Sequence, residues 1–68
     1  MRVDGKKIRR LREEKLLTVR EMESLGGLSR NTIWRIETQE EANARASTIK
    51  KVARVLGVGP HELLGKQA

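Results

Sequence analysis

The chain has 68 residues, a net charge of +6 from fifteen basic and nine acidic side chains, and no cysteine. A chain of this length forms a single domain over residues 1–68, with a modest core over about residues 4–65. Disulfides and thiolate metal sites are excluded, and no apolar run predicts a membrane helix or a signal peptide. The basic charge favours nucleic acid or an anionic membrane as a partner, with a merely solvated surface as the alternative.

The first predicted helix begins after a short lead-in. Asp4 is a good N-cap for a helix that runs to about Lys15. Arg12 lies at the edge of the apolar stripe of this helix, where we expect it to form an ion pair. Leu16 follows at a position that favours glycine or asparagine in the left-handed conformation, so either Leu16 is strained or the turn is built another way.

The next two predicted helices are short and follow each other closely. Thr18 and Glu21 form a capping box that opens a helix ending at about Leu25. Gly26-Gly27 then lets the chain turn sharply, and a third helix spans Ser29–Glu37 with the serine as its cap. This order predicts a helix-turn-helix unit, although many all-helical domains contain a similar corner.

The remaining chain predicts a loop and two more helices. Thr38–Ala46 lacks periodicity and is expected to be a loop in which the polar residues are exposed, namely Gln39, Glu40, Glu41, Asn43 and Arg45. Ser47 is the expected N-cap of a fourth helix, which Gly57 ends. Pro60 suits the first position of a short fifth helix. Apolar residues of the fourth helix recur at i, i+3, i+4 and i+7, namely at Ile49, Val52, Ala53 and Leu56.

The third helix has two unlike faces. Ile33 and Ile36 can point into a core, while polar and aromatic side chains fall away from it. The outward side chains are Arg30, Asn31, Trp34 and Arg35.

This outward face suits the major groove of DNA. Arginine can donate two hydrogen bonds to guanine, and asparagine pairs similarly with adenine. We therefore expect Arg30, Asn31 and Arg35 to read base edges, with phosphate contacts as the alternative. Trp34 could lie against a sugar-phosphate or a thymine methyl, or cover the core; we favour a half-buried position for it.

The chain resembles the phage-repressor and Cro-like helix-turn-helix family, also called the XRE family, in the runs GKKIRRLREEKLLT, GGLSRNTIWRIE, STIKKVARVLGV and HELLG. The resemblance covers about residues 4 to 65. It implies an all-α, five-helix, lambda-repressor-like bundle whose second and third helices form the helix-turn-helix. It also implies sequence-specific binding of double-stranded DNA by a transcriptional repressor or regulator.

The resemblance assigns roles to particular positions. Arg12 and Glu37 match an arginine–carboxylate pair that is buried or semi-buried in this family. Ser29 and Thr32 match positions that contact phosphates or the groove wall, and Trp34 falls on a groove-facing or rim position. The expected DNA-binding set, which includes the start of the second helix, is Thr18, Val19, Arg20, Ser29, Arg30, Asn31, Thr32, Trp34 and Arg35.

Two residues and one loop depart from the family pattern. Val19 stands where the family often has a glutamine that bonds a phosphate, so Arg20 or backbone N–H groups could supply that contact. Glu23 stands where alanine is usual, and must extend to solvent, find a basic partner or push the helices apart. The Thr38–Ala46 loop is about a residue longer than usual.

The sequence also limits other functions. His61 is the only histidine, and no set of acid, base, nucleophile or metal ligands assembles, so we expect no enzyme, metal or cofactor. We expect a homodimer on a palindromic operator through Val58, Leu63 and Leu64, unless all three are core. Alternatives are an antitoxin that binds a partner protein, or the DNA-binding part of a longer regulator. The expected location is the cytoplasm of a bacterial or phage-infected cell.

Overall fold

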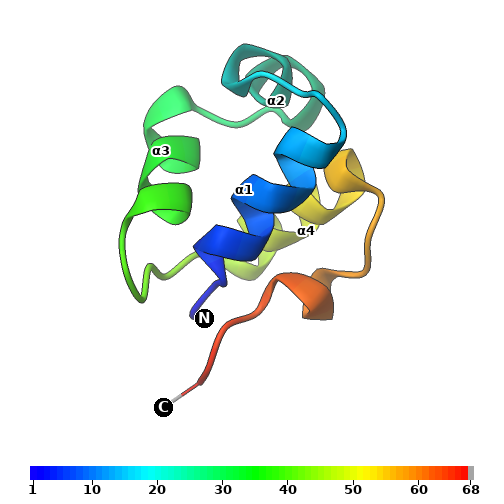
Figure 1. Cartoon of the computed structure of the whole chain (residues 1–68). Helices are drawn as coiled ribbons and strands as arrows, with labels where there is room; N and C mark the ends of the chain where they lie inside the picture. Colours follow the sequence, from blue (N-terminus) through cyan, green and yellow to red (C-terminus); the bar gives the residue numbers. More distant parts are fainter. Residues whose placement is uncertain (68) are drawn as a thin grey trace.

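The computed structural model describes residues 1–67, which form four α-helices and one 3-10 turn (Figure 1). The helices are α1 (Gly5–Glu14), α2 (Val19–Gly26), α3 (Arg30–Thr38) and α4 (Ala46–Leu56), and the turn is η1 (Pro60–Leu63). α2 packs against α3 and α4, α1 packs against α3 and η1, and α4 packs against η1. No helix among residues 1–67 combines the length and the apolar character needed to cross a membrane.

The all-α class is confirmed, but the expected fifth helix is wrong. Pro60 does begin a helical turn, and Glu62 accepts a hydrogen bond from the backbone N–H of Gly59 at 2.9 Å. The turn ends at Leu63, because Leu64 is extended and pairs with Val3 in an isolated antiparallel bridge. That pairing leaves room for a single 3-10 turn.

The first three helices begin at the predicted caps. The Asp4 carboxylate and the Ser29 hydroxyl each accept a hydrogen bond from a backbone N–H three residues further on, at 3.1 Å in both cases. Thr18 and Glu21 form the reciprocal capping box, with hydrogen bonds of 3.1 and 2.9 Å. These signals are local, so the sequence predicts them well.

The predicted cap of the fourth helix is wrong by two residues. α4 begins at Ala46 with Arg45 at its N-cap, so Ser47 lies within the first turn. Ala44, just before the cap, donates its backbone N–H to Met1 O at 2.8 Å, and this long-range pairing fixes where the loop ends. Arg45 has no side-chain acceptor, and the start of α4 has no side-chain cap.

Of the two alternatives for Leu16, the structure shows the strained one. Its φ is 57°, in the left-handed region, and its side chain is 87% exposed. The next residue donates its N–H back to Arg12 O at 3.0 Å and closes α1. The backbone thus makes the turn that a glycine usually makes, with a leucine that faces solvent.

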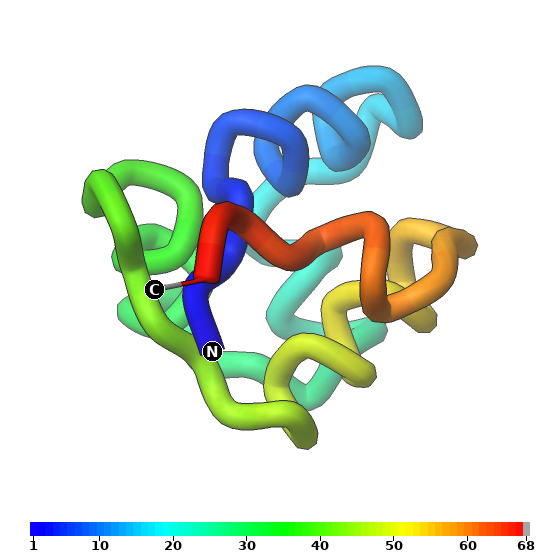
Figure 2. The backbone as a smooth tube through the Cα atoms, turned by 90° about the horizontal axis from the view of Figure 1, so that it is seen from below, coloured from blue at the N-terminus to red at the C-terminus, as the bar shows by residue number. Residues whose placement is uncertain are grey.

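The N-terminal lead-in is a structural element that the sequence pattern does not predict. Its backbone lies between residues 42–44 and the chain after η1 (Figure 2). Val3 donates to Ala42 O at 3.0 Å, and Asp4 donates to Leu63 O at 2.8 Å. Because alternate residues of an extended segment face one side, Ala42 and Ala44 are buried. The loop residues that were expected to be exposed are exposed, namely Gln39, Glu40, Glu41, Asn43 and Arg45.

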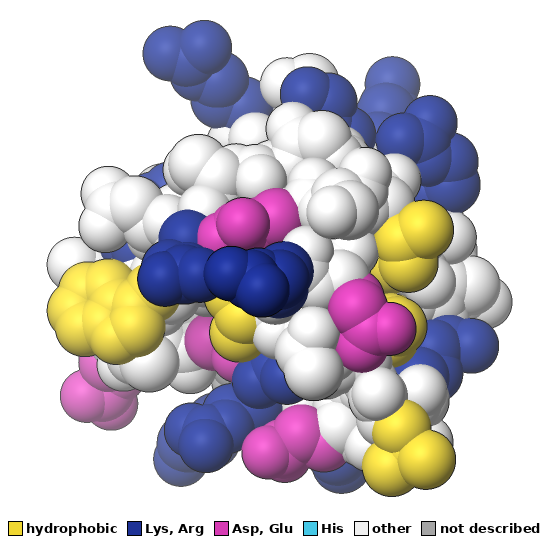
Figure 3. Space-filling view, turned by 90° about the horizontal axis from the view of Figure 1, so that it is seen from above, with side chains coloured by type: hydrophobic (Ala, Val, Ile, Leu, Met, Phe, Trp, Pro, Cys, Tyr) yellow, Lys and Arg dark blue, Asp and Glu magenta, His cyan; other side chains and the backbone are white. Residues whose placement is uncertain are grey.

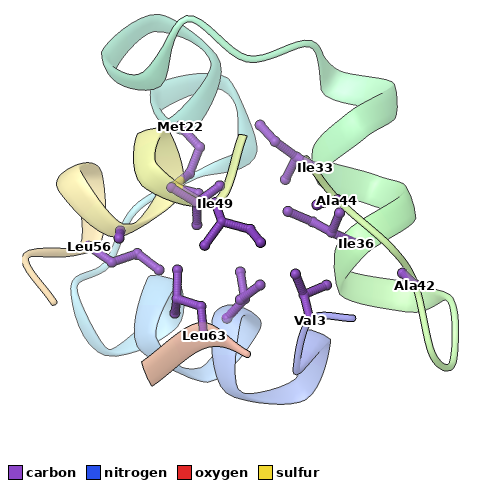
Figure 4. Packing of buried hydrophobic residues seen from close by; sticks show 12 residues of the cluster. Val3, Met22, Ile33, Ile36, Ala42, Ala44, Ile49, Leu56 and Leu63 are labelled. Atoms are coloured by element: carbon purple, nitrogen blue, oxygen red, sulfur yellow. The ribbon is translucent and has the colours of Figure 1, made fainter. Parts of the chain in front are cut away.

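The core combines residues from every helix and from η1. Met22, Ile33, Ile36, Leu56 and Leu63 converge on a common interior (Figure 4). The predicted inner faces are confirmed for α3 and α4, whose core residues are all buried: Ile33, Ile36, Ile49, Val52, Ala53 and Leu56. These inner faces fix which side of α3 is left for solvent.

The expectation that Leu63 helps to pair two copies is not met in this chain. Leu63 is fully buried in its own core, whereas Val58 and Leu64 are half-buried against it. A contact surface near the C-terminal segment would therefore use only the exposed parts of Val58 and Leu64.

Candidate nucleic-acid interface

The turn between α2 and α3 holds the two helices at a fixed angle. Gly27 is left-handed, with φ 63° and ψ 38°, and its N–H donates to Glu23 O. Leu28 donates its N–H to the same oxygen at 3.2 Å and packs against the core. Ser29 then caps α3, so the direction of α3 is set within three residues of the end of α2.

The outward face of α3 begins in its first turn. Arg30 and Asn31 are exposed, while Ile33 and Ile36 hold the opposite face in the core. The hydroxyls of Ser29 and Thr32 hydrogen bond to each other at 2.8 Å beside them. A short helix is thus anchored on one side and offers arginine and asparagine side chains on the other.

Trp34 lies on this outward face and is more exposed than expected. The residue is 58% exposed, so the favoured half-buried position over the core is wrong. Ile33 and Ile36 are already buried on the inner side of α3, so they offer no exposed surface for the indole to cover. An exposed aromatic ring beside Arg30 and Asn31 gives this face an apolar contact group.

Arg35 has a position different from the other outward residues. It is half-buried, and its Nη1 donates to Asn43 O at 2.6 Å. This bond ties α3 to the loop before α4. Arg35 also lines an open hollow together with Met1, Thr32, Asn43, Ala44, Arg45 and Thr48.

Sequence reasoning missed the polar groups on the far side of this hollow. Arg45 and Thr48 stand at the N-terminus of α4, which has no side-chain cap and whose backbone N–H groups and helix dipole favour negative charge. Arg45 and Thr48 lie close to α3 because residues 42–44 pair with the N-terminal segment. The only local signal is a basic residue, Arg45, two positions before the predicted N-cap Ser47.

The start of α2 contributes a smaller polar group. Thr18 and Arg20 are exposed, whereas Val19 is half-buried and packs against the core. The side chain of Val19 therefore offers no hydrogen bond, and any polar side-chain contact at this helix end comes from its two neighbours.

Arg12 and Glu37 form a two-bond ion pair that braces the end of α3. Arg12 Nε and Nη2 donate to the two carboxylate oxygens of Glu37 at 2.8 and 3.0 Å, and Nη1 donates to Leu17 O at 2.8 Å. The side chains are 12% and 5% exposed. The hydrogen bond to Glu37 raises the pKa of Arg12 above its ordinary value, although burial opposes the rise. Through Arg12, α3 is therefore tied to the last turn of α1 and to the chain just before α2.

Glu23 finds a basic partner, which is one of the three outcomes expected for it. Its Oε1 accepts a hydrogen bond from Arg30 Nε at 3.2 Å. Seen from the α2 side, basic side chains are spread over the surface with acidic groups between them (Figure 3). The acidic groups are thus part of this surface and not confined to the opposite side.

Comparison with known proteins gives a family for this arrangement. A model of the helix-turn-helix family matches residues 8–63. The chain is 40% identical over 58 residues to the HTH-type transcriptional repressor RghR of Bacillus subtilis, covering 85% of this chain and 42% of that protein. It is also 40% identical over 60 residues to the uncharacterized HTH-type transcriptional regulator RghRB of the same organism, covering 88% and 42%.

A solved structure supports the same family. The N-terminal DNA-binding domain of SinR, a master biofilm regulator of Bacillus subtilis, superposes with a TM-score of 0.79 at 28% identity. The match covers 93% of this chain and 91% of that domain. The chain spans less than half the length of the curated relatives, and the family model covers most of the chain. The chain belongs to the XRE-type helix-turn-helix family.

Proposed function

We propose that this chain binds double-stranded DNA in a sequence-specific manner and acts as a transcriptional repressor or regulator. The observation that carries the proposal is the outward face of α3, where Arg30, Asn31 and Trp34 are exposed beside a fixed helix-turn-helix corner. Membership of a family that includes a named repressor, and likeness to a DNA-binding domain, support it. Because bacterial DNA lies in the cytoplasm, we propose that location as well.

The proposed roles of these residues follow from their exposure and from where each side chain is held. Arg30 and Asn31 stand in the first turn of α3 and read guanine and adenine edges in the major groove. Trp34 lies against the groove wall. Arg35 is half-buried and its Nη1 is bonded to the loop before α4, whereas Arg30 is exposed, and this supports the phosphate alternative for Arg35.

Phosphate contacts set the register of the protein on the duplex. At one flank they come from Thr18, Arg20 and the N-terminus of α2. At the other flank they come from Ser29, Thr32, and the residues Arg45 and Thr48 at the N-terminus of α4. The two helix N-termini supply backbone N–H groups oriented toward these anions.

We further propose that two copies bind one palindromic operator. The half-buried Val58 and Leu64 provide apolar surface near the C-terminal segment for this contact. A two-fold dimer places its recognition helices about 34 Å apart, one turn of DNA. Recovery of an inverted repeat with that half-site spacing supports the dimer, and recovery of a single unrepeated half-site contradicts it.

Selection of bound duplexes from a random pool tests the proposal. The unmodified chain should enrich one consensus, and Arg30→Ala should lose preference at one guanine while keeping the others. The expected loss in affinity is about 1–3 kcal/mol. Arg54→Ala is the matched control, because it removes the same charge from an exposed position in the last turn of α4. A wild-type chain that enriches no sequence contradicts the proposed function.

A further inference from the structure

Glu23 is the one acidic side chain that touches the outward part of α3 in the described residues. We infer that Glu23 is a positioning residue that aims Arg30 at guanine and away from phosphate. This inference rests on the proposed function and extends it to a residue outside the recognition helix. It starts from the hydrogen bond between Arg30 Nε and Glu23 Oε1 at 3.2 Å.

The backbone of Glu23 is well fixed. Its carbonyl accepts N–H groups from Gly27 and Leu28, so it belongs to the corner that sets the direction of α3. Its neighbour Met22 is fully buried in the core. The side chain, 26% exposed, therefore extends from a rigid base toward the first residue of α3.

The hydrogen bond restricts how Arg30 can bind a base. A guanidinium can present its planar donors to an acceptor pair from more than one edge. With Nε occupied by Glu23, the two Nη groups remain, and neither donates a hydrogen bond within residues 1–67. They form the end-on pair that matches guanine O6 and N7. Glu23 therefore favours one bidentate geometry before DNA arrives.

The negative charge adds a second effect. Phosphates take half or more of protein–DNA hydrogen bonds, so a mobile arginine beside DNA readily binds the backbone. A carboxylate against Nε repels a phosphate at that point. It repels the guanine edge less, because O6 and N7 carry only partial negative charges whereas a phosphate carries a full one. The pair thus weakens general attraction to DNA while it strengthens the preference for one base.

Four variants separate this role from a structural one, using selection from a random duplex pool. Glu23→Ala removes the acceptor and the charge, and Glu23→Gln removes only the charge and keeps an oxygen that can accept from Nε. Glu13→Ala is the matched control, because Glu13 pairs with Arg9 at 3.5 Å on exposed α1. Arg30→Ala identifies the guanine position. Circular dichroism should show that all four variants fold, since exposed ion pairs contribute little to stability.

Glu23→Ala should lower the guanine preference about tenfold at the position that Arg30→Ala abolishes, and leave other positions unchanged. It should also bind a scrambled duplex more tightly than the wild-type chain does. Glu23→Gln should keep part of the preference, and Glu13→Ala should keep all of it. An unchanged consensus for Glu23→Ala, or equal effects of Glu23→Ala and Glu13→Ala, overturns the inference alone. A wild-type chain without a consensus overturns the proposed function and this inference together.

Discussion

At the scale of single residues, the ion pair between Arg12 and Glu37 is the polar contact whose removal should lower the free energy of unfolding most. Glu37→Gln removes the charge that satisfies a guanidinium of which only 12% of the side chain is exposed. Leaving that cation without its anion should cost about 3 kcal/mol, near the lower end for a buried pair because some solvent still reaches Arg12. Urea unfolding followed by circular dichroism measures the loss.

The control for this prediction is Glu14→Gln. Glu14 pairs with Arg10 at 3.7 Å on the solvent face of α1, with both side chains more than half exposed. Its removal should change the free energy of unfolding by less than about 0.5 kcal/mol. Equal losses for the two variants would show that the Arg12–Glu37 pair does not brace α3.

The candidate site was predictable residue by residue only in part. The outward directions of Arg30 and Asn31 follow from helical periodicity and from the two core isoleucines. The exposure of Trp34 and the bond from Arg35 to Asn43 do not, because they depend on how much surface the core leaves and on the path of a loop. The sequence allowed three outcomes for Glu23, and the contact with a basic partner was one of them.

At the scale of elements, the packing of α1 on α3 depends on a glycine. A Cβ atom on Gly5 would overlap the backbone carbonyl of Ile36. Because the clash is with backbone atoms, no side-chain movement can remove it. Gly5→Ala should therefore push the two helices apart and destabilise the fold by roughly 2 kcal/mol. A thermal melt measures the effect.

Gly59→Ala is the matched control for this packing prediction. Gly59 has φ −72°, which alanine adopts freely, and a Cβ there would lie 3.6 Å from Glu62 Oε2 in ordinary contact. It should leave the melting temperature unchanged or raise it slightly. A Gly5→Ala variant as stable as Gly59→Ala contradicts the close approach of α1 and α3.

Elements with local signals were predictable, and elements set by distant partners were not. The caps at Asp4, Thr18 and Ser29 act within three residues, so their positions follow from the sequence. The start of α4 and the length of η1 follow from backbone pairing with the N-terminal segment instead. A sequence pattern based on neighbouring residues cannot predict a backbone partner about forty positions away.

For the whole molecule, the net charge of +6 predicts how binding depends on salt. With about five phosphates neutralised per chain, log K against log salt should have a slope between about −4 and −5. Fluorescence anisotropy of a labelled duplex over a salt series measures it. Arg45→Ala should reduce the slope by about 1, because it removes one proposed phosphate contact. Binding that is insensitive to salt contradicts the electrostatic part of the proposal.

The central claim is that DNA lies on the outward face of α3, and Trp34 reports on it directly. Trp34 is the only tryptophan in the chain and is 58% exposed on that face. Its emission should change on addition of the selected duplex, in step with the anisotropy of that duplex, and return to its starting value at high salt. A scrambled duplex at the same concentration should change it less. Binding of the selected duplex with Trp34 emission unchanged would contradict the account.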